Sequence, residues 1–150
     1  MIGMTLTLAA LQTLPADLLA RRDAQEIADA YNADPANAEV AEYWLTDRGL
    51  VADLVIASGG TDLSDSILNK FDAAMAASRS AKAQINRLYN DAKGLNFGDP
   101  ALRAWFVAHT PDVFTEAERD ALLALAVRPA SVSEYDVRRL CWADNGFWLA

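Results

Sequence analysis

The chain has 150 residues, 53% of them hydrophobic, and a formal net charge of −8. A chain of this length can bury a core without covalent staples, and this hydrophobic content excludes an intrinsically disordered protein. The negative charge argues against a protein that holds nucleic acid through phosphate contacts, because such proteins need a basic surface.

Two further features indicate the compartment in which the protein is made. The single cysteine, Cys141, leaves no partner for an internal disulfide and is typical of a reducing compartment. No apolar run approaches the roughly 20 residues that span a bilayer, and the first residues lack the basic start of a secretory signal. We therefore expect a protein made in the cytoplasm, without a membrane partner.

Helix-start and helix-stop residues recur along the chain, whereas strand signals are nearly absent. Thr5–Leu8 alternates for only four residues, which is too short to predict a strand. Pro15 is typical of a first helical turn, and Asp23 with Glu26 has the spacing of a capping box. Asp34-Pro35 then ends that helix.

The middle of the chain continues this pattern. A short piece holds Val40, Tyr43 and Trp44, and Thr46 then caps a helix that ends at Ser58-Gly59-Gly60. Asp62 or Ser64 opens the next helix. Ser78 starts another, in which Ala81, Ile85, Leu88 and Ala92 share one face before Gly94 closes it.

Three more helices follow, beginning at Asp99-Pro100, at a Thr115/Glu118 capping box and at Ser133. The sequence therefore predicts an all-α, compact single domain over residues 1–150, with about eight short helices and no significant sheet. The expected core is Ile27, Tyr31, Trp44, Leu54, Ile67, Phe71, Ile85, Leu88, Trp105, Leu122 and Leu125.

No constellation of catalytic or metal-binding residues is apparent. One histidine and one cysteine provide no pair at metal-ligand spacing, so we expect no metal and no organic cofactor. His109 ends an apolar helix, where an imidazole can bond free carbonyl groups, and Cys141 lies between Leu140 and Trp142 as a small core residue would. We predict a protein that is not an enzyme.

Charge is unevenly distributed along the chain. Residues 23–65 contain ten acids and one base, whereas residues 66–106 contain six bases and three acids. This pattern fits two solvated faces of one domain. It also fits complementary contacts between copies, in which an acidic face of one meets a basic face of the next.

Two features are candidate interaction sites. Opposite the apolar face of the helix near residues 79–93, a basic stripe consists of Arg79, Lys82 and Lys93, with Asn86 and Asn90 between them. The tail at residues 142–150 carries Trp142, Phe147 and Trp148, which are costly to leave in water. Either this tail folds back on its own core, or it inserts into a neighbour as an aromatic anchor.

Several stretches resemble a family of small helical proteins encoded among the virion genes of tailed bacteriophages and prophages. The resemblance rests on Glu26–Asn32 with its following proline loop, Trp44, the Arg-Pro-Ala-Ser segment at 128–131, and Tyr135-Asp136-Val137. Together these stretches cover about two-thirds of the chain in the family's order. The family's long middle insertion is absent, and the Phe147-Trp148 tail has no counterpart. The resemblance implies a structural or morphogenesis protein of the neck or tail, located in the virion, and brings no catalytic residues.

Two functions follow as hypotheses. The first is a non-enzymatic bacteriophage virion or assembly protein that binds copies of itself, as a homo-oligomer, or a neighbouring structural protein. The alternative is a soluble acidic inhibitor of a host defence protein that mimics nucleic acid through the acids of residues 23–65. Such a mimic needs those carboxylates on one continuous face. The aromatic tail favours the first hypothesis, and the charge favours the second equally well.

Overall fold

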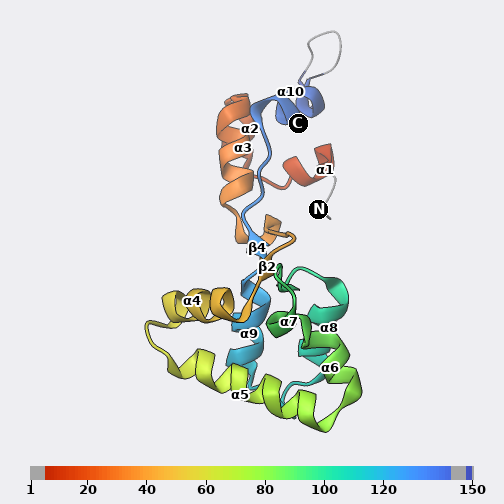
Figure 1. Cartoon of the computed structure of the whole chain (residues 1–150). Helices are drawn as coiled ribbons and strands as arrows, with labels where there is room; N and C mark the ends of the chain where they lie inside the picture. The colour runs from red at the N-terminus through yellow and green to blue at the C-terminus, as the bar shows by residue number, and fades with distance from the viewer. Residues whose placement is uncertain (1–5, 143–147, 150) are drawn as a thin grey trace. The chain divides into compact units, whose positions relative to one another are not determined.

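A computed structural model describes residues 6–142 and 148–149 and divides the chain into two compact units (Figure 1). Unit 1 consists of residues 1–40 and 128–150, and unit 2 of residues 41–127. The sequence predicted one domain instead. The connections between the units are as short as those within them, so linker length gave no sign of the division. Both units are mainly helical, as predicted.

Unit 1 combines helices from the N-terminal and the C-terminal parts of the chain. It contains α1 (Leu8–Leu11), α2 (Ala16–Ala20), α3 (Ala24–Ala33), the 3-10 helix η1 (Pro35–Asn37) and α10 (Glu134–Cys141). The Asp23 carboxylate accepts hydrogen bonds from the first backbone N–H groups of α3, as the sequence predicted. Ser133 caps α10 in a full capping box with Asp136. Both helices therefore begin at residues whose side chains accept hydrogen bonds from N–H groups of the first helical turn.

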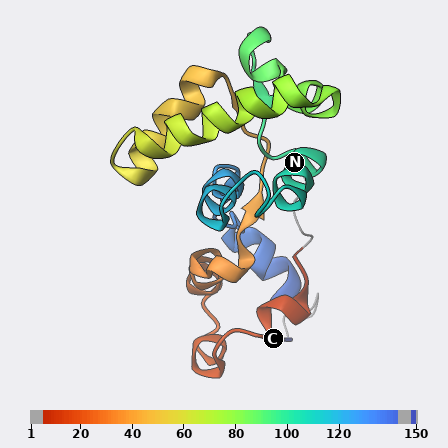
Figure 2. The same ribbon diagram turned by 90° about the horizontal axis from the view of Figure 1, so that it is seen from below.

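The core of unit 1 forms where α10 packs on α3 (Figures 1 and 2). Asn32 fixes this packing, because its amide donates to the Val132 carbonyl and its carbonyl accepts from the Val132 N–H, both at 2.9 Å. The buried residues of this core are Leu11, Leu19, Ala24, Ile27, Ala28, Tyr31, Ala130, Val137 and Cys141.

Unit 2 contains the remaining helices: α4 (Asp47–Ser58), α5 (Asp62–Ala77), α6 (Arg79–Ile85), α7 (Arg87–Asn90), α8 (Pro100–Ala108) and α9 (Glu116–Ala124). Helices α4 and α5 lie side by side (Figures 1 and 2). Thr46 caps α4, Gly59 ends it in the left-handed conformation, and Thr115 with Glu118 forms the predicted capping box of α9.

An aromatic cluster fills the centre of unit 2. Phe71, Phe106 and Phe114 are fully buried, and their ring centroids lie 5.7–6.1 Å apart. Phe97 stacks on Phe106 at 6.2 Å. Of the predicted core, only Trp44, Trp105 and Leu125 are half-buried rather than buried.

Sheet structure is minimal in the part of the chain that the structure describes. Strand β2 (Trp44–Leu45) pairs antiparallel with β3 (Leu95–Asn96), with Trp44 opposite Asn96. Strand β1 (Glu39–Val40) pairs with β4 (Val127–Arg128). These pairs add to the all-helical prediction without changing the fold class.

The helix predicted from Ser78 to Gly94 is wrong in its second half. Ser78 does cap α6, but α6 ends at Ile85 and α7 spans only Arg87–Asn90. The Asn90 amide bonds Asn86 instead of solvent, and the chain then turns through Asp91, whose carboxylate accepts from the Lys93 N–H at 2.9 Å. Asparagine and aspartate side chains that bond the local backbone compete with a helix in this way.

Candidate interaction surfaces

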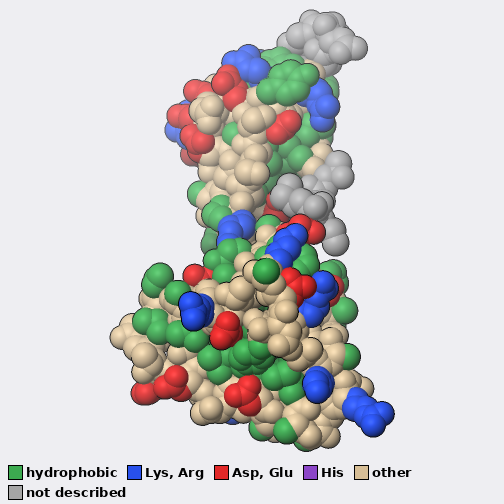
Figure 3. Space-filling view, in the orientation of Figure 1, with side chains coloured by type: hydrophobic (Ala, Val, Ile, Leu, Met, Phe, Trp, Pro, Cys, Tyr) green, Lys and Arg blue, Asp and Glu red, His purple; other side chains and the backbone are tan. Residues whose placement is uncertain are grey.

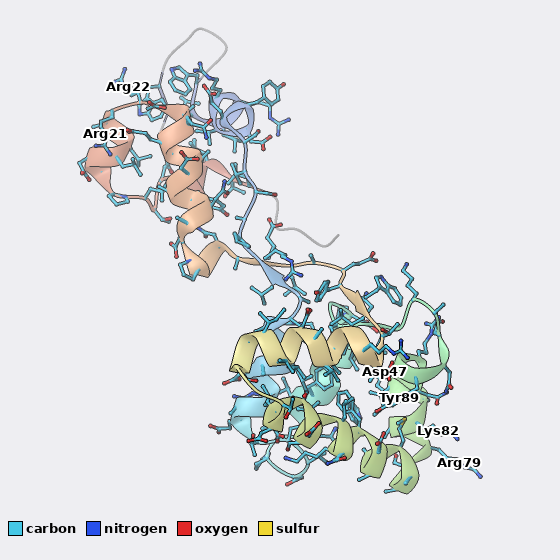
Figure 4. All side chains as sticks on the ribbon, turned by 60° about the vertical axis from the view of Figure 1, so that its left-hand side comes forward. Arg21, Arg22, Asp47, Arg79, Lys82 and Tyr89 are labelled. Atoms are coloured by element: carbon cyan, nitrogen blue, oxygen red, sulfur yellow. The ribbon has the colours of Figure 1, made fainter. Side chains whose placement is uncertain are left out.

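The helix break at Asn86 separates the residues predicted to form one basic stripe. Arg79 and Lys82 lie on α6 and point away from the rest of unit 2 (Figure 4). Lys93 lies beyond α7, and its ammonium group stacks over the Trp44 ring at 4.2 Å from the centroid. The prediction of one continuous stripe is therefore wrong, since only Arg79 and Lys82 share a helix.

The tail residues that the structure describes lie on the core of unit 1. Trp148 and Trp142 form an isolated antiparallel bridge, and their rings meet edge to face at 4.4 Å. Both pack against the buried cluster of unit 1, and the Leu149 N–H donates to the Cys141 carbonyl at 2.6 Å. Of the two alternatives for the tail, the structure shows the fold-back for Trp142 and Trp148. Phe147 lies outside the described residues.

The folded-back tail creates a surface that sequence reasoning missed. The Arg22 guanidinium lies over the Trp148 ring at 5.9 Å from its centroid, and the Arg138 guanidinium lies over the Trp142 ring at 5.8 Å. Arg22 is labelled in Figure 4. Tyr135, seven residues before Trp142 on α10, is 70% exposed. Arg22, Tyr135, Arg138, Trp142 and Trp148 form what we call the aromatic–arginine surface. Trp142 follows α10 in an extended conformation, so helical spacing in the sequence gave no signal for this surface.

A second missed surface lies on α4. From Gly49 to Gly60 the chain carries one charged residue, Asp53, and the Tyr43 hydroxyl donates to its carboxylate. Leu50 and Leu54 are buried, so the other apolar residues of the helix point outward. We call Val51, Ala52, Val55 and Ile56 the α4 face.

The α4 face is open in this structure. Ile56 is 82% exposed, Ala52 is exposed, and Val51 and Val55 are half-buried. Hydrophobic side chains gather over this part of unit 2 (Figure 3). An exposed group of neighbouring apolar side chains is typical of a contact surface.

The acids of residues 23–65 are divided equally between the two units, five in each. Several have local roles: Asp23 caps α3, Asp34 caps η1, and Glu26 pairs with Arg21 at 3.1 Å. Asp23, Asp34 and Glu26 therefore serve helix ends or an ion pair within unit 1, which are structural roles.

The residues that could take part in catalysis lie in surroundings typical of structural residues. His109 ends α8, and its Nδ1 lies 2.9 Å from the Trp105 carbonyl, as predicted for a helix end. Cys141 is fully buried, and burial raises the pKa of its thiol. Burial, the hydrogen bond to Asp72 and the charges of Asp72 and Asp47 also raise the pKa of Tyr89 (Figure 4). These shifts favour the protonated thiol and phenol, which are poor nucleophiles.

Glu118 is the one charged side chain in the core among the described residues. Its carboxylate accepts from the Thr115 N–H at 2.9 Å and the Ser66 hydroxyl at 2.6 Å, and it pairs with the Lys70 ammonium. Burial alone would raise its pKa, but the hydrogen bonds from Lys70, Ser66 and Thr115 lower it to about 2. The network ties α9 to α5, which is a structural role.

Within residues 6–142 and 148–149, no group of three histidine, cysteine, aspartate or glutamate residues is placed to hold a metal ion. No helix of this described part is both long and apolar enough to cross a membrane. No family model, curated protein or solved structure matches the chain.

Proposed function

We propose that this chain is a non-enzymatic structural or assembly protein of a tailed bacteriophage, which acts by binding copies of itself or a neighbouring virion protein. The observation that carries the proposal is the α4 face, where Ile56 is 82% exposed on a helix with one charged residue between Gly49 and Gly60. The resemblance of the sequence to proteins encoded among virion genes is the reason for proposing a bacteriophage protein.

Energetics support a binding role for this face. Burying one Ile side chain is worth about 1.5–3 kcal/mol, which corresponds to roughly tenfold to hundredfold in affinity. Val51 and Val55 flank Ile56 on the same face and would add area. The alternative, an acidic inhibitor that mimics nucleic acid, has less support because several of its carboxylates cap helices or pair with a local arginine.

The test compares two variants that each place a charge on an exposed apolar position of unit 2. Ile56→Asp puts a carboxylate on the α4 face, whereas Val107→Asp puts one on α8, at a position that is 51% exposed. Both should fold, as circular dichroism would check. We expect Ile56→Asp to weaken self-association in sedimentation, or co-sedimentation with virions, by about tenfold or more, and Val107→Asp to leave both unchanged. Equal behaviour of the two variants and the wild type would reject the proposal.

A further inference from the structure

The aromatic–arginine surface of unit 1 offers cations and apolar area together. The two tryptophans meet edge to face, and one arginine lies over each ring. A guanidinium that lies over an indole can still donate its N–H groups to a carboxylate at the ring's edge. Arg138 already does so, since its Nε and Nη2 donate to Glu134 on the same helix. Arg22 has no carboxylate within ion-pair distance among the described residues, and its side chain is exposed.

The backbone conformation of Arg22 also supports a functional role for the aromatic–arginine surface. Its φ of 53° lies in the left-handed region, and it is the only non-glycine residue there in the described part of the chain. Arg22 lies between α2 and α3, directly after the C-cap of α2, and its guanidinium lies over the Trp148 ring. A non-glycine residue held in this region costs free energy, and such residues are concentrated at functional sites.

Unit 2 presents the complementary chemistry where α4 turns into α5. Ile56 stands on the α4 face, and the Ser58–Gly60 turn leads directly to Asp62 and Asp65 in the first turn of α5. Both aspartates are exposed, and neither has a cationic partner in the part of the chain that the structure describes. Their carboxylates also complement the positive start of the α5 dipole.

We infer that copies of the chain join head to tail, with the aromatic–arginine surface of one copy on the α4 face and the adjoining Asp62 and Asp65 of the next. This inference rests on the proposed function and names the self-contact. Apolar area meets apolar area, Ile56 against the tryptophan pair, and arginines meet unpaired aspartates. Each unit has a net charge of −4, from nine acids and five bases in unit 1 and twelve acids and eight bases in unit 2.

That net charge explains why the contact is specific. Two copies repel each other over most of their surfaces, so a stable contact forms where opposite charges meet. Arg79 and Lys82 are also basic, but they extend from α6 without exposed aromatic neighbours on that helix, so they provide charge alone. A contact between two different surfaces is heterologous and adds copies one after another.

One-sided variants test this arrangement. Ile56→Asp disables the α4 face, and the double variant Arg22→Glu with Arg138→Glu disables the aromatic–arginine surface. The single variant Arg22→Glu replaces the double variant if the latter does not fold, because it leaves the Arg138–Glu134 pair intact. Each variant retains one functional surface. We expect each to sediment as a monomer alone and an equimolar mixture to form a dimer and nothing larger, with at least about a tenfold preference for the mixed pair.

Three outcomes separate this inference from the function on which it rests. A mixture that stays monomeric while the wild type assembles would overturn the head-to-tail contact. So would assembly that Ile56→Asp abolishes and both arginine variants leave intact, which would point to an α4–α4 contact. A monomeric wild type whose co-sedimentation with virions still depends on Ile56 would overturn the self-contact and leave the proposed function standing.

Discussion

The Glu118 network predicts how the stability of unit 2 depends on pH. The folded protein holds the pKa of Glu118 at about 2, below the ordinary value of 4.5. Its stabilisation is therefore fully present above about pH 4.5 and is lost as the pH falls towards about 2. At about 1.36 kcal/mol per pKa unit, the shift corresponds to about 3 kcal/mol in the free energy of unfolding.

The perturbation is Glu118→Gln, which keeps the size of the side chain but removes the charge that faces Lys70. We expect the free energy of unfolding near neutral pH to fall by about 2–3 kcal/mol, because the Lys70 ammonium loses its counter-ion while only 31% exposed. Near pH 2 most of this difference should disappear, since Glu118 is then protonated in the unfolded state and about half protonated in the folded state.

Urea unfolding followed by circular dichroism, at both pH values, measures the difference. Glu116→Gln is the matched control, because Glu116 is another acid in the first turn of α9 but is exposed. Its effect should stay within about 0.5 kcal/mol. The reasoning would be refuted if the two variants lost equal stability at neutral pH, or if the loss in Glu118→Gln persisted at low pH.

Three further predictions concern local structure. Gly94→Ala should destabilise unit 2 by more than about 2 kcal/mol, because φ is +83° and an added Cβ would lie 2.0 Å from the Leu45 carbonyl oxygen; Gly60→Ala, which meets open space, should be nearly neutral in thermal unfolding. Asn32→Ala should lower the stability of unit 1 by about 1–3 kcal/mol, since it removes both hydrogen bonds to Val132; exposed Asn69→Ala is the control, and equal melting temperatures would contradict the prediction. Trp148→Ala should lower the free energy of unfolding of unit 1 by about 1–3 kcal/mol, because this half-buried side chain packs on the core of that unit. An unchanged urea midpoint would contradict this prediction and favour the other alternative, a tail that anchors to a neighbour.

Helix starts could be predicted from the sequence because capping is local chemistry. Thr46, Ser78, Asp99, Thr115 and Ser133 each accept a backbone hydrogen bond at the position that the sequence indicated. Most of the expected core is buried for a similar reason, since apolar residues at helical spacing share a face.

The division into units and the two surfaces could not be predicted in the same way. Both depend on which faces find partners far along the chain, such as α3 with α10, and spacing does not specify partners. Ile56 illustrates the limit: its neighbours Leu50 and Leu54 are buried, and the sequence alone does not distinguish a buried apolar face from an exposed one. The break at Asn86 was missed because no proline or glycine marks it; the Tyr89 N–H bonds the Asn86 carbonyl at i−3 spacing instead of the α-helical i−4 spacing.

The most direct test of a binding role is side-chain footprinting with hydroxyl radicals, applied to the protein alone at low concentration and to the protein in its assembled or virion-bound form. Ile56, 82% exposed in the free chain, should be strongly labelled alone and largely protected in the assembly, whereas Val107, 51% exposed, should be labelled equally in both. Equal labelling of Ile56 in the free and the assembled protein would contradict the account.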